Sequence, residues 1–137
     1  MFVALAAVAF SACQTERIER ERETLTPMSF EKVTLEDNFW LPRLKIQKET
    51  LVPFSLDKTA YAVENLRRTG QYLRGEKIEK GFEGPYYVAS DLFKVMEGAA
   101  YLLTLEKDAE LEAQMDEIID IIASAQDKDG YLYEVHI

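Results

Sequence analysis

Two short segments of the chain combine aromatic rings with short polar side chains. Tyrosine rings cover the C–H faces of a sugar, while carboxylate and hydroxyl groups form hydrogen bonds with its hydroxyls. This mixture of residue types therefore predicts contacts to a saccharide. The candidates, from "GPYYVASD" (84–91) and "AQDKDGYLY" (125–133), are Tyr86, Tyr87, Ser90, Asp91, Asp129 and Tyr131.

The same residues also have purely structural interpretations. Ser90 or Asp91 suits the N-cap of a helix that follows, and Asp129 is a common turn residue before a glycine. The tyrosines could be half-buried packing residues. The residues alone leave both interpretations open, and neither segment fixes the geometry of a catalytic group, so no catalytic residue is assigned to this chain.

Two helices must position these segments. Apolar residues recur at helical spacing over 91–105 and again over 109–126, and Asp108 is placed to cap the second helix. Because so few residues join them, the two helices should pack as an antiparallel hairpin. Such a hairpin would bring 84–91 and 125–133 to the same end.

The preceding region reads as further helices after a short extended arm. Alternation over 29–40 predicts a strand or arm that leads to a buried Phe39–Trp40 pair. Helices are expected over 43–51 and 56–68, interrupted by Pro53 and stopped at Gly70, with a loop over 71–89. Paired helices without a strand-rich partner indicate an all-α fold.

Charge and cysteine content exclude several functions. A net charge of −9 and a pI near 4.7 argue against nucleic acid or an anionic membrane as partners held by bulk charge. The only cysteine is Cys13, so an internal disulfide and a multi-cysteine metal site are both impossible within this chain. No metal ligand is assigned here.

The N-terminus has the pattern of an exported protein. Residues 2–10 are apolar and uncharged, and the "SAC" that ends at Cys13 resembles the lipobox of bacterial lipoproteins. We expect a signal segment at 1–12, lipidation at Cys13 and a charged tether over 13–28. The expected location is the periplasm or outer membrane, with the lipid anchor as the membrane contact. The alternative is a cytosolic helix with an isolated cysteine.

Several motifs together resemble glycoside hydrolase family 127, the β-L-arabinofuranosidase family. They are "FEKVTLEDNFWLPRL", "NLRRTG", "SDLFKVMEGAAYLL" and "DAELEAQMDEIIDIIASAQDKDGYLY". The sequence departs from the family at Ala89, where Asp is frequent, and at Phe93 and Val95, where Tyr and Trp are frequent. The resemblance implies a hydrolase that acts on β-L-arabinofuranosides or related plant-derived glycans.

The resemblance also implies an (α/α)6 toroid, the six-hairpin glycosidase fold, and a retaining glycosidase with a cysteine nucleophile near a zinc ion. No position here matches those catalytic or zinc-binding residues, so zinc is expected only in the full-length protein. Residues 29–137 would form the N-terminal part of the catalytic domain. We expect this fragment alone to be inactive and poorly stable, because its apolar stripes would lack neighbours. The alternatives are a non-catalytic helical lipoprotein that binds glycans, and a lyase or unsaturated glucuronyl hydrolase on a similar toroid.

Overall fold

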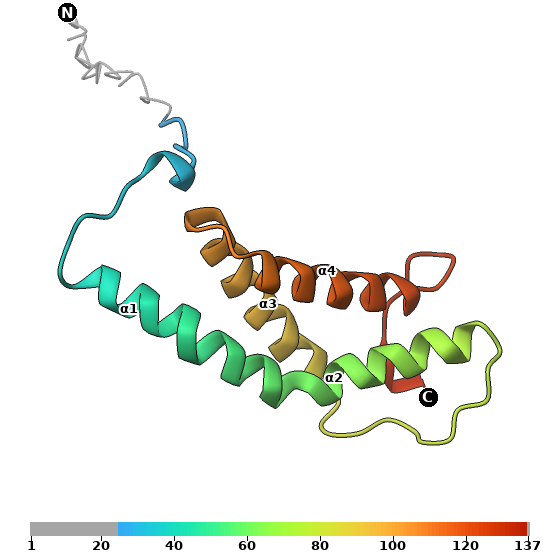
Figure 1. Ribbon diagram of the computed structural model, residues 1–137. Coiled ribbons are helices and arrows are strands. Elements are labelled where there is room, and N and C mark those ends of the chain that lie inside the picture. The colour runs from blue at the N-terminus through green and yellow to red at the C-terminus, as the bar shows by residue number, and fades with distance from the viewer. Residues whose placement is uncertain (1–24, 137) are drawn as a thin grey trace, which may run out of the picture.

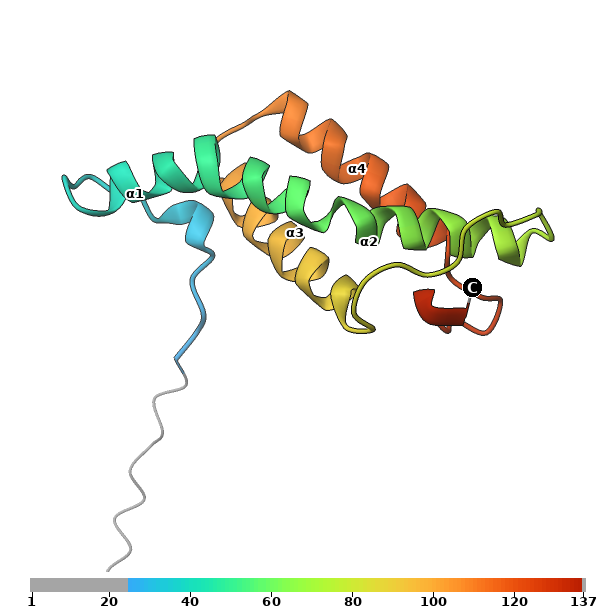
Figure 2. The ribbon, with the colours of Figure 1, turned by 90° about the horizontal axis from the view of Figure 1, so that it is seen from below.

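The computed structural model describes residues 25–136, and over that range the chain is all-α, as expected. Figure 1 shows a long α2 that packs against both α3 and α4, and Figure 2 shows the same arrangement from below. The helices are α1 (Trp40–Ile46), α2 (Val52–Leu73), α3 (Val88–Leu105) and α4 (Ala109–Ser124). A π-helical segment, Gln47–Leu51, joins α1 to α2, and short 3-10 turns lie at Phe30–Lys32 and Glu134–His136.

The core lies where α2 meets the other two long helices. Leu66 of α2 and Leu92 of α3 are completely buried, and Ile118 of α4 packs in the same cluster. Each such side chain contributes about 1.5–3 kcal/mol relative to an exposed position. The helical periodicity of α3 and α4 is therefore confirmed, because buried residues at this spacing in both helices belong to one core cluster with those of α2.

Pro53 does not interrupt the helix as expected. The backbone N–H of Val52 donates to the carbonyl of Gln47, five residues back, which is the π-type spacing. A proline inside a helix lacks an N–H and crowds the preceding turn. The wider π turn just before Pro53 accommodates it, and α1 continues into α2 without a break.

The predicted stop at Gly70 is also wrong, because α2 continues to Leu73. The helix ends in a Schellman motif, in which Gly75 adopts φ 78° and its N–H donates to the carbonyl of Tyr72 at 2.9 Å. Gly70 has another role, since a Cβ there would lie 2.5 Å from Oγ of Ser124 on α4. It allows the two helices to approach closely.

The start of α3 differs from the expectation that Ser90 or Asp91 caps it. The helix begins at Val88 after Tyr87, and no side chain caps it. The Ser90 hydroxyl instead donates to the Tyr87 carbonyl at 2.7 Å. Val88 is buried in the core, so its packing favours an earlier start, and the expected loop over 71–89 shortens at both ends.

The cap at Asp108 is confirmed. Its carboxylate accepts the backbone N–H of Leu111 at 3.1 Å, and α4 runs from Ala109 to Ser124, slightly shorter than expected. Lys48 lies 3.0 Å from the carboxylate of Glu106 and 3.4 Å from that of Asp108, which ties the π-helical segment to the α3–α4 connection. The hairpin itself is splayed, and α3 and α4 diverge from this connection over the surface of α2 (Figure 1).

The Phe39–Trp40 pair is not buried as expected. These side chains are 54% and 55% exposed, and their rings meet edge to face at 4.9 Å. Arg43 lies over the Phe39 ring at 3.6 Å. The arm before α1 forms no strand within the described residues, and its Phe30 contacts Tyr101 of α3 instead of covering this pair.

The signal segment, Cys13 and most of the expected tether lie outside the described residues. Within 25–136, none of the helices combines the length and apolar character that a membrane crossing requires.

Candidate functional site

The loop before α3 is fixed to α2 by a buried asparagine. Asn65 is completely buried; its amide donates to the Glu83 carbonyl at 2.8 Å and its carbonyl accepts the Glu83 N–H at 3.0 Å. This paired arrangement satisfies both backbone groups of a loop residue, as a strand partner would. The loop that presents Tyr86 and Tyr87 is therefore held in place at its base.

A buried arginine adds to this attachment. The Arg68 guanidinium donates to the Gly81 carbonyl at 2.8 Å, and it pairs with the carboxylates of Glu83 at 3.1 Å and Glu64 at 3.2 Å. Lys80 forms a second ion pair with Glu83. The hydrogen bond from Lys80 and next that from Arg68 hold the pKa of the Glu83 carboxyl below its usual value. Glu83 is thus a charged residue whose ion pairs stabilise the loop.

The first candidate segment presents two tyrosine rings to solvent. Tyr86 is 71% exposed, and its ring meets that of Tyr87 edge to face at 5.4 Å. Asp91 pairs with Lys94 one turn along α3 at 2.9 Å. The two rings lie side by side, and Ser90 and Asp91 follow in the first turn of α3, so rings and short polar side chains lie close together in the sequence at this end of the helix.

The second candidate segment is a turn closed by its own hydrogen bonds. The Asp127 N–H donates to the Tyr131 carbonyl at 2.8 Å, and the Tyr131 N–H donates to the Asp129 carboxylate at 2.9 Å. The Gln126 amide donates to the Gly130 carbonyl at 2.8 Å. Asp129 therefore stabilises the turn. A ligand that contacts its carboxylate would bind beside this hydrogen bond.

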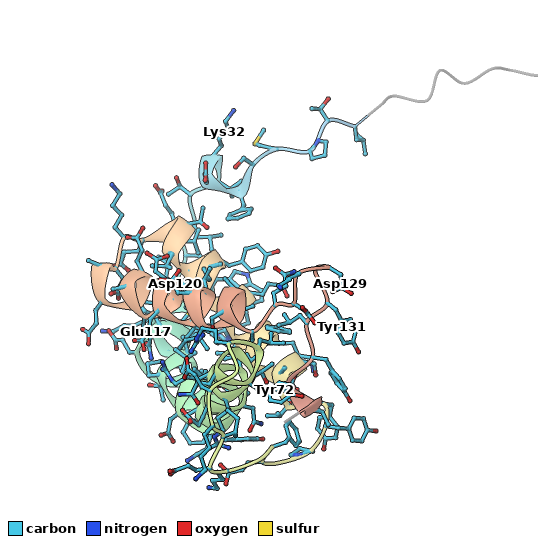
Figure 3. All side chains as sticks on the ribbon, turned by 90° about the vertical axis from the view of Figure 1, so that its right-hand side faces the viewer. Lys32, Tyr72, Glu117, Asp120, Asp129 and Tyr131 are labelled. Atoms are coloured by element: carbon cyan, nitrogen blue, oxygen red, sulfur yellow. The ribbon has the colours of Figure 1, made fainter. Side chains whose placement is uncertain are left out.

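Tyr131 lines a cavity together with Tyr72, which was not among the candidates predicted from the sequence. A cavity of about 220 Å³ separates the C-terminal end of α2 from the turn after α4. In Figure 3, Tyr72 and Tyr131 approach it from these two elements, whereas Asp129 lies farther out on the turn. The lining residues are Thr69, Tyr72, Leu73, Ala125, Asp127, Tyr131 and Tyr133.

The two candidate segments meet α2 at different positions. Gly84 lies against the Tyr61 ring, whereas the second segment shares a cavity with Thr69 and Tyr72 of α2. The eleven positions from Tyr61 to Tyr72 correspond to about 16 Å along the helix axis. The splayed hairpin therefore gives two groups of candidate contacts rather than one.

Sequence reasoning missed Tyr72 because it ended the helix at Gly70. The i, i+3 spacing of Thr69 and Tyr72 would have placed both on one face of a longer α2. Asp127, which precedes the turn at Asp129 and Gly130, also lines the cavity and was not among the candidates. No group of three or more His, Cys, Asp or Glu among the described residues could hold a metal ion, so these residues do not fit the zinc that the family resemblance implies.

Comparison with known families gives a match over most of the chain. A model described as the β-L-arabinofuranosidase, GH127 catalytic domain matches residues 32–136. The chain belongs to the GH127 family. The all-α architecture of this GH127 chain agrees with the assignment, as do two solved structures.

The first structure is a GH127 β-arabinofuranosidase at 32% identity and a TM-score of 0.67, covering 79% of this chain and 17% of that one. The second is a GH127 β-L-arabinofuranosidase from Geobacillus stearothermophilus T6, at 31% identity and a TM-score of 0.65, covering 74% and 17%. A non-reducing end β-L-arabinofuranosidase from Bifidobacterium longum is 30% identical over 73% of this chain. This GH127 chain spans 18% of that relative, which corresponds to one portion of a helical catalytic domain.

Proposed function

We propose that the full-length protein is a glycoside hydrolase that removes β-L-arabinofuranosyl residues from plant-derived glycans. The observation that supports this most directly is the match of residues 32–136 to the GH127 catalytic domain. The relatives named β-L-arabinofuranosidase supply the sugar and the linkage in this proposal.

The proposed role of this chain is to position substrate contacts. Tyr86, Tyr87, Ser90 and Asp91 would form one group, held by the contacts of Asn65 and Arg68 with the loop. Asp129 and Tyr131 would contribute from the turn after α4. No catalytic residue is proposed among 25–136, and the zinc ion and cysteine nucleophile expected for the full-length protein would lie outside these residues.

We also propose that the protein is exported and anchored through Cys13. The support is the apolar segment at 2–10 and the small residues before the cysteine. Incorporation of labelled palmitate into the wild-type protein, and its loss in Cys13→Ala, is the expected result. Labelling that persists in the variant would contradict the anchor without affecting the proposed activity.

The activity is tested with the full-length protein and aryl glycosides. We expect release of p-nitrophenol from the β-L-arabinofuranoside and little from the α-L-arabinofuranoside. Hydrolysis of neither, together with retention on arabinan, would favour the glycan-binding alternative. Release of unsaturated uronic acids from uronate-containing oligosaccharides instead would favour a lyase or glucuronyl hydrolase.

The contact residues are tested by paired variants. Tyr86→Ala should raise KM for the aryl β-L-arabinofuranoside about fivefold, the value expected for losing one aromatic contact of ~1 kcal/mol. Tyr101→Ala on the outer surface of α3, 51% exposed, is the control and should leave KM unchanged. Equal KM values for the two variants would remove Tyr86 from the proposed site.

A further inference from the structure

The cavity between α2 and the turn after α4 is built from rings on both of its sides. Tyr72 comes from the last turn of α2, and Tyr131 and Tyr133 come from the turn, where their rings meet at 6.3 Å. Tyr72 is 53% exposed, although α2 is the most central helix of the structure. An exposed aromatic side chain that lines a cavity beside polar groups is a common feature of ligand sites.

The frame around this cavity is fixed. The Thr69 hydroxyl donates to the Asn65 carbonyl at 2.9 Å, and its second contact, with the Glu134 carbonyl at 3.4 Å, reaches from α2 to the segment after the turn. Next to Thr69 and Ala125, which line the cavity, Gly70 and Ser124 bring α2 and α4 into direct contact. A site that is already ordered loses little conformational entropy when a ligand binds.

One polar group in the cavity wall is an exposed carboxylate. Oδ1 of Asp127 accepts the Lys128 N–H at 2.6 Å, and a carboxylate has about four acceptor positions, so one such bond does not exhaust it. Asp127 thus offers a hydrogen-bond acceptor beside three phenol rings. A sugar ring, with C–H faces and outward hydroxyls, matches this combination of surfaces.

The volume suits a ligand of one ring. At about 220 Å³ the cavity is smaller than the ~300–1,000 Å³ of sites for drug-sized molecules. We propose that this cavity binds a single sugar ring of the glycan substrate, stacked on Tyr72 and hydrogen-bonded to Asp127. The inference rests on the proposed function for the class of ligand, and it adds a subsite about 16 Å along α2 from the Tyr61–Gly84 contact.

The test measures binding of methyl 1-thio-β-L-arabinofuranoside, a probe that resists hydrolysis, to the full-length protein by calorimetry and saturation-transfer NMR. Tyr72→Ala should raise the dissociation constant about tenfold, and Asp127→Asn should raise it about fivefold. Asparagine keeps an oxygen for the Lys128 N–H, so the turn is preserved while the acceptor at Oδ2 is lost. Tyr101→Ala is the matched control, because Tyr101 is also a half-exposed helical tyrosine but lies outside the cavity.

The outcomes separate this inference from the proposed activity. If the protein hydrolyses the β-L-arabinofuranoside but Tyr72→Ala and Asp127→Asn bind the probe as the wild type does, the subsite is refuted and the activity stands. If hydrolysis is absent but both variants lose sugar binding, the subsite stands and the activity fails. Choline that binds more tightly than the sugar, with the same loss in both variants, would make the cavity a cation site and overturn the inference. Circular dichroism spectra that match the wild type establish that each variant is folded.

Discussion

Replacing Gly70 by alanine tests the close contact between α2 and α4. A Cβ at this position would lie 2.5 Å from the Ser124 Oγ and 2.9 Å from the Ser124 carbonyl oxygen. The hydroxyl can rotate away, but the carbonyl belongs to the backbone of α4, so the helices themselves must separate. Overpacking of this kind costs about 1–3 kcal/mol.

The gain in helix propensity opposes this cost and sets the net magnitude. Alanine is favoured over glycine by about 1 kcal/mol inside a helix. We therefore expect Gly70→Ala to lower the free energy of unfolding by about 0–2 kcal/mol. Gly98→Ala is the matched control, because Gly98 lies within α3 and a Cβ there meets nothing within 4 Å. That variant should gain about 1 kcal/mol.

Urea denaturation followed by circular dichroism at 222 nm measures both variants. The expected difference between them is about 1–3 kcal/mol, with Gly98→Ala the more stable. Because Gly70 and Ser124 are the neighbours of Thr69 and Ala125, which line the cavity, Gly70→Ala should also weaken binding of the thioglycoside probe. Equal stabilisation by the two substitutions would show that α2 and α4 do not meet at Gly70, and the argument for a fixed cavity would fail with it.

Three further predictions concern the loop, the charged connection and the exposed surface. Asn65→Ala should lower the free energy of unfolding by about 1–3 kcal/mol, because the backbone N–H and carbonyl of Glu83 lose their partner; an unchanged exchange rate of the Glu83 amide would contradict this. The pKa of Asp108 lies below its ordinary value of 3.8, mainly because the carboxylate accepts the Leu111 N–H and also because Lys48 is near. The pKa of Lys48 lies above its ordinary value of 10.5, mainly because of its hydrogen bond to Glu106. The stability that Asp108 contributes is therefore present above pH ~4 and is lost as the pH falls through its lowered pKa in the folded protein. The stability that Lys48 contributes is present below pH ~10 and is lost as the pH rises through its raised pKa in the folded protein. Urea titrations should show a smaller acid loss in Asp108→Asn, where the contribution of Glu83 remains, and a smaller alkaline loss in Lys48→Met. Finally, the 137-residue chain alone should be inactive and should bind a hydrophobic dye more strongly than the full-length protein, because large side chains such as Leu41 and Ile119 are exposed; cooperative unfolding of the chain together with glycosidase activity would refute this.

Helices whose apolar residues follow a regular period could be predicted from the sequence. The stripes of α3 and α4 and the cap at Asp108 are local features, because they depend on residues within about one turn of each other. The predictions at Pro53 and Gly70 were wrong because the effect of each residue depends on what surrounds it in the folded chain. A π turn accommodates Pro53, and the contact with Ser124 explains a glycine at position 70 inside a continuous helix.

The sequence predicted which types of residue the candidate site contains, but not which of these residues lie together. Tyr86, Tyr87 and Tyr131 are exposed, as ligand contacts must be. Their assignment to one end of a compact hairpin depended on the angle between α3 and α4. That angle is set by how both helices pack on α2, which no local pattern records.

By itself, the sequence determined the helical class, the family motifs and the residue types suited to a sugar. These properties follow from local periodicity and from the chemistry of individual side chains. Only the tertiary structure decided that Tyr72 and Asp127 share a cavity with Tyr131, and that Tyr86 belongs to a separate group. The physical reason is the path of α2, which continues past Gly70 and so brings a tyrosine to a turn more than fifty residues later in the chain.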